Sequence, residues 1–255
     1  MSSLERHQRI IELVHEKGYE SVINLCKELK VSAVTLRKDI KFLEKNNQLF
    51  RTHGGASVNN PFTIGRSVNE KEGLEREEKR SIAKKAAEYI ESNDSIIIAS
   101  GTTMLALARE IGAKQKLTVI TSALQVAGEL VNRGNVDILQ LGGMVRKSSS
   151  SVVGTYAELV LKDFYCTKLF LGVDGIDFDF GVTTSNSMES QLNRSMIKMV
   201  QKVIVLADHT KFGRRGFSKI CGLDEIDEII TDKKIAPAIL EKYRNAGIKI
   251  TLVGE

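Results

Sequence analysis

The chain has 255 residues, of which 42% are hydrophobic and 27% are charged, and it carries a net charge of +5. No apolar run approaches the roughly 18 residues of a membrane span, and the opening MSSLERHQRI lacks the apolar segment of a signal peptide. This composition excludes a membrane protein and predicts a cytosolic protein of two domains, with a mildly basic balance that suits a polyanionic partner. Cys26, Cys166 and Cys221 are far apart, so we expect neither disulfides nor a metal site, and no cofactor.

Three short helices are predicted in the first 56 residues. The first spans residues 5–17 and packs its apolar residues inward. Ser21 can cap a second helix, whose apolar residues fall at positions i, i+3, i+4 and i+7, namely Val22, Leu25, Cys26 and Leu29. Ser32 can cap a third helix.

The third helix has one apolar and one basic side. Leu36, Ile40 and Leu43 share the apolar side, and lysines lie opposite them at about 100° per residue. Between residues 32 and 51 there are five basic and two acidic side chains, which suits phosphate neutralisation. Residues 49–55 are predicted to form a β wing. A lysine stripe alone is typical of a solvated helix face, but the order of elements indicates a winged helix-turn-helix that docks on double-stranded DNA.

The candidate DNA-binding residues divide into base readers and backbone contacts. We expect the third helix to direct Ala33, Thr35, Arg37 and Lys38 toward the major groove, with Ser32 at its start. Phosphates or a groove edge would be contacted by Lys41, Lys45, Arg51 and His53.

The run VSAVTLRKDIKFLEKNNQLFRTHGGA closely resembles the DeoR family of bacterial sugar-operon repressors. Its matches to the family pattern are Ser32, Thr35, Arg37, Asp39, Leu43, Leu49, Arg51, His53, Gly54 and Gly55. Lys38 replaces an arginine, which keeps the charge and loses the bidentate fork. Asn47 replaces a glycine, and asparagine tolerates a left-handed turn.

A polar, charge-mixed stretch at residues 57–75 is predicted as a linker between domains 1–56 and 76–255. The second domain alternates apolar strands with helices, which favours an α/β fold with a mostly parallel sheet. Strands are expected near 95–99, 116–121, 136–141, 168–176, 202–208, 226–232 and 248–253. Helices are expected near 78–91, after 103, up to 130, over 155–162, up to 199 and near 237–245.

Ligands of such sheets bind at the carboxyl ends of the strands. The loop Ser100-Gly101-Thr102-Thr103 starts a helix and suits a phosphate, although Ser and Thr there are also ordinary helix caps. The remaining candidate effector-binding residues follow later strands: Thr121, Ser122, Gly142, Gly143, Gly154, Asp174, Asp177, Thr183 and Lys211. Asp174 and Asp177 are acceptors for sugar hydroxyls, and Lys211 can pair with a phosphate. The serine run 148–151 is equally typical of a flexible loop.

The segments ASGTT, LGGMVRKSSSSVVG, KLFLGVDGID and VLADHTKF resemble the effector domain of DeoR repressors. The resemblance implies a fold like that of sugar-phosphate isomerases and a phosphorylated sugar as inducer. GVDGID and LNRSM are most similar to regulators of N-acetylgalactosamine and related amino-sugar operons. Ala99 and Ser122 replace residues usual in the family, so the sugar contacts are expected to differ.

These patterns predict a repressor that acts as a homo-oligomer on paired operator half-sites. One alternative is a sugar-phosphate isomerase or deaminase that carries a DNA-binding module, with Asp174, Asp177, Glu189 and His209 as acid and base candidates. Fold similarity alone does not carry such activity. Another is a DNA-binding protein whose α/β domain only mediates oligomerisation.

Overall fold

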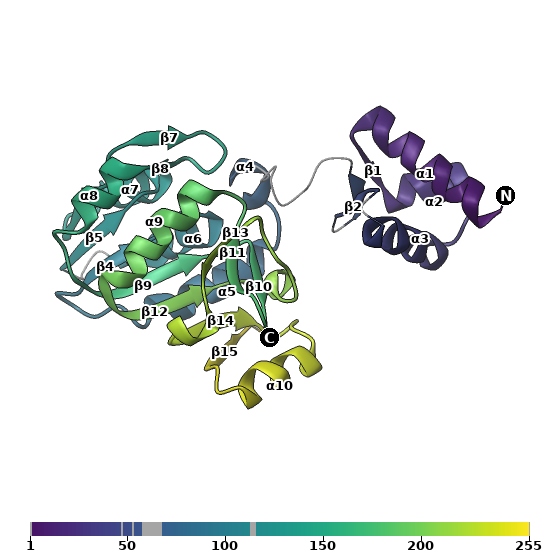
Figure 1. Ribbon diagram of the computed structural model, residues 1–255. Coiled ribbons are helices and arrows are strands. Elements are labelled where there is room, and N and C mark those ends of the chain that lie inside the picture. Colours follow the sequence, from purple (N-terminus) through teal and green to yellow (C-terminus); the bar gives the residue numbers. More distant parts are fainter. Residues whose placement is uncertain (1, 47, 53, 58–67, 113–115, 255) are drawn as a thin grey trace. The chain divides into compact units, whose positions relative to one another are not determined.

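The structure is a computed structural model that describes residues 2–46, 48–52, 54–57, 68–112 and 116–254. The chain divides into two compact units, Met1–Gly65 and Arg66–Glu255. Each unit is described by itself (Figure 1).

The first unit is a three-helix domain with a small antiparallel sheet. Its elements are α1 (Ser3–Lys17), β1 (Tyr19–Ser21), α2 (Val22–Leu29), α3 (Ala33–Lys45), β2 (Phe50–Arg51) and β3 (Gly55–Ser57). The strand order is β1-β3-β2. Residues predicted to face inward do form the core, among them Ile10, Leu25, Leu36, Ile40 and Leu43. The winged helix-turn-helix fold is thereby confirmed.

Strand β1 was absent from the prediction because three residues carry too little pattern to be recognised. It pairs with β3, so that Ser21 lies opposite Gly55. A Cβ on Gly55 would lie 2.1 Å from the carbonyl oxygen of Glu20. Glycine is required at Gly55 because of this close strand approach.

The second unit contains a seven-stranded sheet. Its elements are α4 (Val68–Glu72), α5 (Arg76–Ala87), β4 (Ser95–Ile98), α6 (Thr102–Glu110), β5 (Leu117–Thr121), α7 (Leu124–Leu130), β6 (Val136–Gln140), β7 (Met144–Arg146), β8 (Ser151–Val153), α8 (Thr155–Leu161), β9 (Cys166–Gly172), β10 (Gly175–Asp177), β11 (Gly181–Thr184), α9 (Ser187–Lys198), β12 (Val200–Leu206), η1 (His209–Lys211), β13 (Ser218–Cys221), η2 (Leu223–Glu225), β14 (Glu228–Asp232), α10 (Pro237–Asn245) and β15 (Ile250–Val253).

The sheet order is β15-β14-β12-β9-β4-β5-β6, and each pair of neighbouring strands is parallel. Side chains alternate between its faces. Ile96 and Ile98 pack with α5, α6 and α7, whereas Ile97 packs with α8, α9 and the small sheet β10-β11-β13. This arrangement confirms the predicted α/β class and brings the carboxyl ends of the parallel strands to one edge.

Two segments differ from their predicted character. Ser151 belongs to β8, which pairs with β7 in an antiparallel hairpin, so part of the serine run is ordered strand. Within the stretch predicted as a linker, α4 forms a helix of the second unit, and residues 58–67 lie outside the described residues. The amide of Val68 donates to the carbonyl of Ser148 (2.7 Å), which joins α4 to the hairpin loop.

Candidate functional site

The outer face of α3 is exposed and basic. Arg37, Lys38 and Lys41 are exposed, and within the described residues none of them has an ion-pair partner. Val34 is 63% exposed on the same helix. An exposed cationic helix with an apolar side chain near its start can contact phosphates, base edges and a thymine methyl group.

The inner face of α3 is fixed to α1 by Asp39. Arg6 donates to both carboxylate oxygens of Asp39 (Nε to Oδ2 2.6 Å, Nη2 to Oδ1 3.0 Å), and Nε2 of His7 lies 2.9 Å from Oδ1. Burial opposes ionisation of Asp39, yet the hydrogen bond from Arg6 and the one with His7 lower its pKa. One of the two acidic residues of the predicted recognition helix, Asp39, therefore turns inward, which leaves the outer face more basic than the sequence count suggests.

The other predicted DNA contacts differ in their surroundings. Ser32 caps α3, because its Oγ accepts from the amide of Thr35 (3.2 Å) and lies 3.0 Å from Thr35 Oγ1. Arg51 on β2 is 54% exposed, and its amide donates to Oε1 of Glu44 (3.2 Å), which ties the wing to α3. His53 and the side chain of Lys45 lie outside the described residues.

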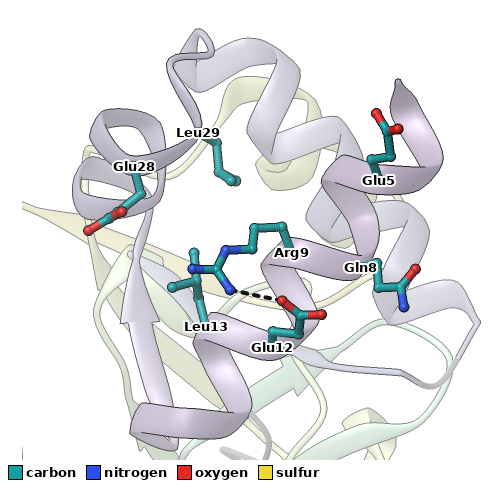
Figure 2. Close-up of a pocket in the computed structure, with 7 residues that line it drawn as sticks. All are labelled: Glu5, Gln8, Arg9, Glu12, Leu13, Glu28 and Leu29. Atoms are coloured by element: carbon teal, nitrogen blue, oxygen red, sulfur yellow. Dashed lines mark hydrogen bonds and ion pairs between the residues drawn. The ribbon is translucent and has the colours of Figure 1, made fainter. Parts of the chain in front are cut away.

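A shallow groove of about 560 Å³ lies between α1 and α2 (Figure 2). It is lined by Glu5, Gln8, Arg9, Glu12, Leu13, Glu28 and Leu29. Arg9 donates to Glu12 (2.9 Å), so the remaining carboxylates leave the groove negative. A phosphate would be repelled from this groove.

Helix α6 begins at the carboxyl edge of the sheet, directly after β4. Its N-cap is Gly101, with φ +126°, and among the described residues no side chain caps it. A Cβ on Gly101 would meet nothing within 4 Å. The ordinary capping role of Ser and Thr is thus not seen here, and the first-turn N–H groups remain suited to an anion. Ser100 and Thr102 are half-buried beside them, whereas Thr103 is buried.

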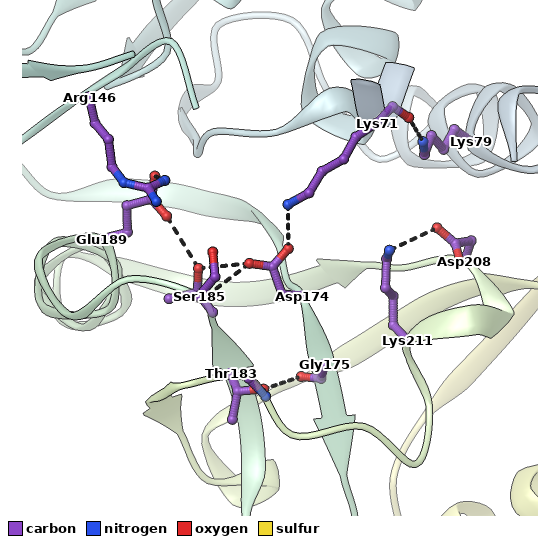
Figure 3. A network of polar contacts seen from close by, with 12 residues as sticks. Lys71, Lys79, Arg146, Asp174, Gly175, Thr183, Ser185, Glu189, Asp208 and Lys211 are labelled. Carbon is purple, nitrogen blue, oxygen red and sulfur yellow. Dashed lines mark hydrogen bonds and ion pairs between the residues drawn. The ribbon is translucent and has the colours of Figure 1, made fainter. Parts of the chain in front are cut away.

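A polar network centred on Asp174 lies at the same edge (Figure 3). Nζ of Lys71 donates to Asp174 Oδ1 (2.8 Å). Asp174 Oδ2 accepts from the amide of Ser185 (2.9 Å) and from Oγ1 of Thr184 (3.2 Å). Burial opposes ionisation, but Lys71 and then Lys211 hold the pKa of Asp174 at about 2. Asp174 is therefore an ionised acceptor in a half-buried position.

Three lysines and two carboxylates lie in this network. Nζ of Lys211 lies 3.7 Å from Asp208 Oδ2, and the positive charges of Lys211 and Lys79 help to lower the pKa of Asp208 against the effect of burial. Burial lowers the pKa of Lys79. With Lys71 and Asp174 included, the cluster keeps one positive charge in excess. That excess favours an incoming anion.

Other predicted effector contacts have intramolecular partners. Thr121 Oγ1 donates to the carbonyl of Ile98 (2.7 Å), and Thr183 Oγ1 donates to that of Gly175 (3.1 Å). Asp177 pairs with Arg215 at the β10–β11 turn (2.9 Å). Ser122 is buried, and its carbonyl accepts from the amide of Val152 (2.8 Å). Gly142 and Gly143 follow β6, and Gly154 precedes α8.

Sequence reasoning missed Lys71, Lys79 and Arg146. Arg146 pairs with Glu189 (3.2 Å). Oε2 of Glu189 lies 3.3 Å from Thr184 Oγ1, whose single hydroxyl hydrogen goes either to Glu189 or to Asp174. A charge-mixed run such as EKEGLERE gives no signal that one of its lysines enters a site. Glu189, by contrast, was a titratable candidate from the sequence, and its side chain is buried.

The chain matches two family models. Residues 6–62 match the DeoR-like helix-turn-helix domain, and residues 74–233 match the DeoR C terminal sensor domain. Within the described residues, no helix has the length and apolar character needed to cross a membrane, and no cluster of potential metal ligands occurs.

Similar proteins were found over nearly the whole chain. The "Putative aga operon transcriptional repressor" of Escherichia coli O157:H7 is 38% identical, with 98% of this chain and 94% of that protein covered. The "Uncharacterized HTH-type transcriptional regulator YulB" of Bacillus subtilis is 35% identical (98% and 96%), and the "Glycerol-3-phosphate regulon repressor" of Escherichia coli K12 is 30% identical (99% and 100%). A ribose 5-phosphate isomerase structure from Methanocaldococcus jannaschii has a TM-score of 0.40 at 14% identity, with 52% of this chain and 53% of that chain covered. A likeness this distant carries no functional argument.

Proposed function

Because the chain belongs to the DeoR family of transcriptional regulators, we propose that it represses a sugar-utilisation operon and leaves its operator when a phosphorylated sugar binds. Its relatives are named as transcriptional regulators rather than as isomerases or deaminases, so the chain is a regulator and not an enzyme. The observation that supports the sugar-phosphate effector best is the cation-rich network around Asp174, next to the uncapped start of α6.

The recognition helix is α3. Arg37 and Lys38 read base edges in the major groove, and Lys41 and Arg51 hold the phosphate backbone. Val34 joins the readers, because an exposed apolar side chain on the basic face suits a thymine methyl group. Asp39 keeps α3 at a fixed angle to α1 through its two bonds from Arg6.

The effector lies at the carboxyl edge of the sheet. Its phosphate binds the N–H groups that start α6, beside Ser100 and Thr102, with Lys211 supplying a counter-charge. Its hydroxyl groups donate to Asp174, whose lowered pKa keeps it ionised. The relative named for the aga operon favours an amino-sugar phosphate within this class.

The regulator acts as a homo-oligomer through the outer surface of α8. Tyr156, Leu159 and Val160 are exposed on this helix, and Phe164 and Tyr165 follow it. The three aromatic residues are 76%, 39% and 65% exposed, which amounts to roughly 350 Å² of aromatic surface. Leu159 and Val160 enlarge this patch, which suits the apolar centre of a standard interface of roughly 800 Å² per partner. The occupant is a second copy of this chain, since symmetric pairing places two recognition helices on adjacent half-sites.

A binding screen tests the effector. Calorimetry of the purified chain with pentose and hexosamine phosphates, each paired with its unphosphorylated sugar, should show binding only to phosphorylated compounds. Binding of none of them would favour an α/β unit that only mediates oligomerisation. Conversion of any of them, followed as isomer or ammonia release, would contradict the assignment as a non-enzymatic regulator.

A further inference from the structure

Helix α4 (Val68–Glu72) follows residues 58–67, which lie outside the described residues, and contacts the effector site of the second unit. It is only five residues long, and its one buried apolar residue is Val68. The contacts of the other described α4 side chains with the second unit are polar. Glu72 pairs with Arg109 of α6 (3.0 Å), and Lys71 pairs with Asp174 (2.8 Å). An isolated helix of this length is not stable in water, so these contacts determine whether α4 forms.

A buried lysine, Lys79, also stabilises this helix through hydrogen bonds to its backbone. Nζ of Lys79, whose residue is only 6% exposed, donates to the carbonyl of Lys71 (2.6 Å) and also to the carbonyl of Leu74. These carbonyls belong to the end of α4 and the turn after it, where the helix dipole favours a cation. Lys79 thus supports the backbone of Lys71 while the side chain of Lys71 reaches into the site (Figure 3).

The two oxygens of Asp174 have different partners. Oδ2 is used by the amide of Ser185 and by Thr184 on the strand β11 side, whereas Oδ1 contacts Lys71. Both side chains of the ion pair are more than a quarter exposed. An effector hydroxyl that donates to Asp174 therefore binds Oδ1, the oxygen that Lys71 contacts. This ion pair is accessible to solvent.

We propose that Lys71 competes with the effector for Asp174 Oδ1. Binding of the effector displaces Lys71 from this oxygen, and α4 then detaches from the second unit. This proposal rests on the function proposed above and adds the step that links the ligand to the linker. With α4 docked, residues 68–72 are part of the second unit. With α4 released, they no longer belong to that unit, and operator binding weakens. The effector and α4 docking are thus negatively coupled.

The coupling predicts two changes in a Lys71→Met variant. Without effector, its affinity for DNA should fall about fivefold, since the released state becomes more populated. The effector should then weaken its DNA binding less than it weakens that of the wild type, because no docked Lys71 remains to be displaced. Lys71→Arg keeps a cation and should resemble the wild type. Lys84→Met, on the exposed side of α5, removes a lysine of equal size away from Asp174 and serves as the matched control.

Two measurements on the full chain test this proposal. The DNA probe is a duplex selected by the wild-type protein from a random pool, read by fluorescence anisotropy without effector. The ligand probe is galactosamine 6-phosphate, read by calorimetry, with amide exchange of residues 68–75 followed in parallel. Faster exchange in Lys71→Met, together with weaker DNA binding and wild-type behaviour of Lys71→Arg, would support the proposal.

Wild-type DNA affinity and wild-type exchange in Lys71→Met would overturn it, as would equal defects in Lys71→Met and Lys71→Arg. The DNA and exchange measurements use no effector, so they decide the role of Lys71 even if galactosamine 6-phosphate does not bind. Failure of every phosphorylated sugar to release the wild type from DNA would instead contradict the proposed function.

Discussion

Replacing Lys41 by methionine should reduce the salt dependence of DNA binding. Lys41 is exposed on the outer face of α3, and none of the described residues pairs with it, so its ammonium is available to a phosphate. Each phosphate contact contributes about 0.9 to the slope of log K against log salt concentration. Two chains bound to paired half-sites lose one contact each. The slope should therefore become shallower by about 1.8, while the preference between operator sequences changes little.

Anisotropy titrations at four or more salt concentrations measure this slope. The control is Arg9→Gln, which also removes one positive charge. Arg9 lies in the acidic groove between α1 and α2 (Figure 2), where it pairs with Glu12, and neighbouring carboxylates repel DNA from that surface. An unchanged slope for Lys41→Met, or an equal decrease for Arg9→Gln, would show that α3 is not the helix that meets the phosphates.

Three further substitutions test a base contact, the effector site and the α8 interface, and a fourth tests stability. Arg37→Ala should weaken operator binding by about 1 to 3 kcal/mol, and an unchanged gel-shift affinity would remove Arg37 from the contacts. Lys211→Ala should raise the sugar-phosphate concentration needed for release about tenfold, which dose-response curves of DNA release measure; an unaltered curve would contradict its role. Tyr156→Glu should shift the chain toward monomer in analytical ultracentrifugation, and an unchanged assembly would exclude the α8 surface. Burial opposes ionisation of Glu228, but hydrogen bonds from Tyr89, from Thr251 and from two lysines hold its pKa at about 2, below the ordinary 4.5. Since the folded pKa is the lower one, this stabilisation of about 3 kcal/mol is complete above pH 4.5 and is lost as the pH falls toward 2. Urea unfolding of Glu228→Gln should lose that part of the pH dependence, and a wild-type dependence would contradict the assignment.

The sequence predicted the fold well where apolar periodicity was strong. Leu36, Ile40 and Leu43 repeat at helical spacing, and all three are buried. In the parallel strand β4 the apolar run Ile96–Ile98 is continuous, because both faces of the sheet are covered. The short strands β1, β7, β8, β11 and β13 were missed, since three or four residues give no measurable alternation, and β10 was merged with β9 in one predicted strand.

The site was predictable only in part. Gly101 and Asp174 follow strands, and the carboxyl ends of parallel strands meet at one edge, so strand order alone brings such residues together. Lys71 reaches the same edge from a helix far away in the sequence, and only tertiary packing places its ammonium on Asp174. The inward turn of Asp39 likewise depends on Arg6 of another helix, which periodicity within α3 does not reveal.

The same chain is proposed to bind DNA and to sense a phosphorylated sugar. The most direct test is anisotropy of the selected duplex bound to the wild-type chain, followed while phosphorylated sugars and their unphosphorylated forms are added. We expect at least one phosphorylated sugar to release the chain from the duplex at concentrations where the unphosphorylated form has no effect. Binding to DNA that no phosphorylated sugar alters, or no binding to any duplex, would contradict it.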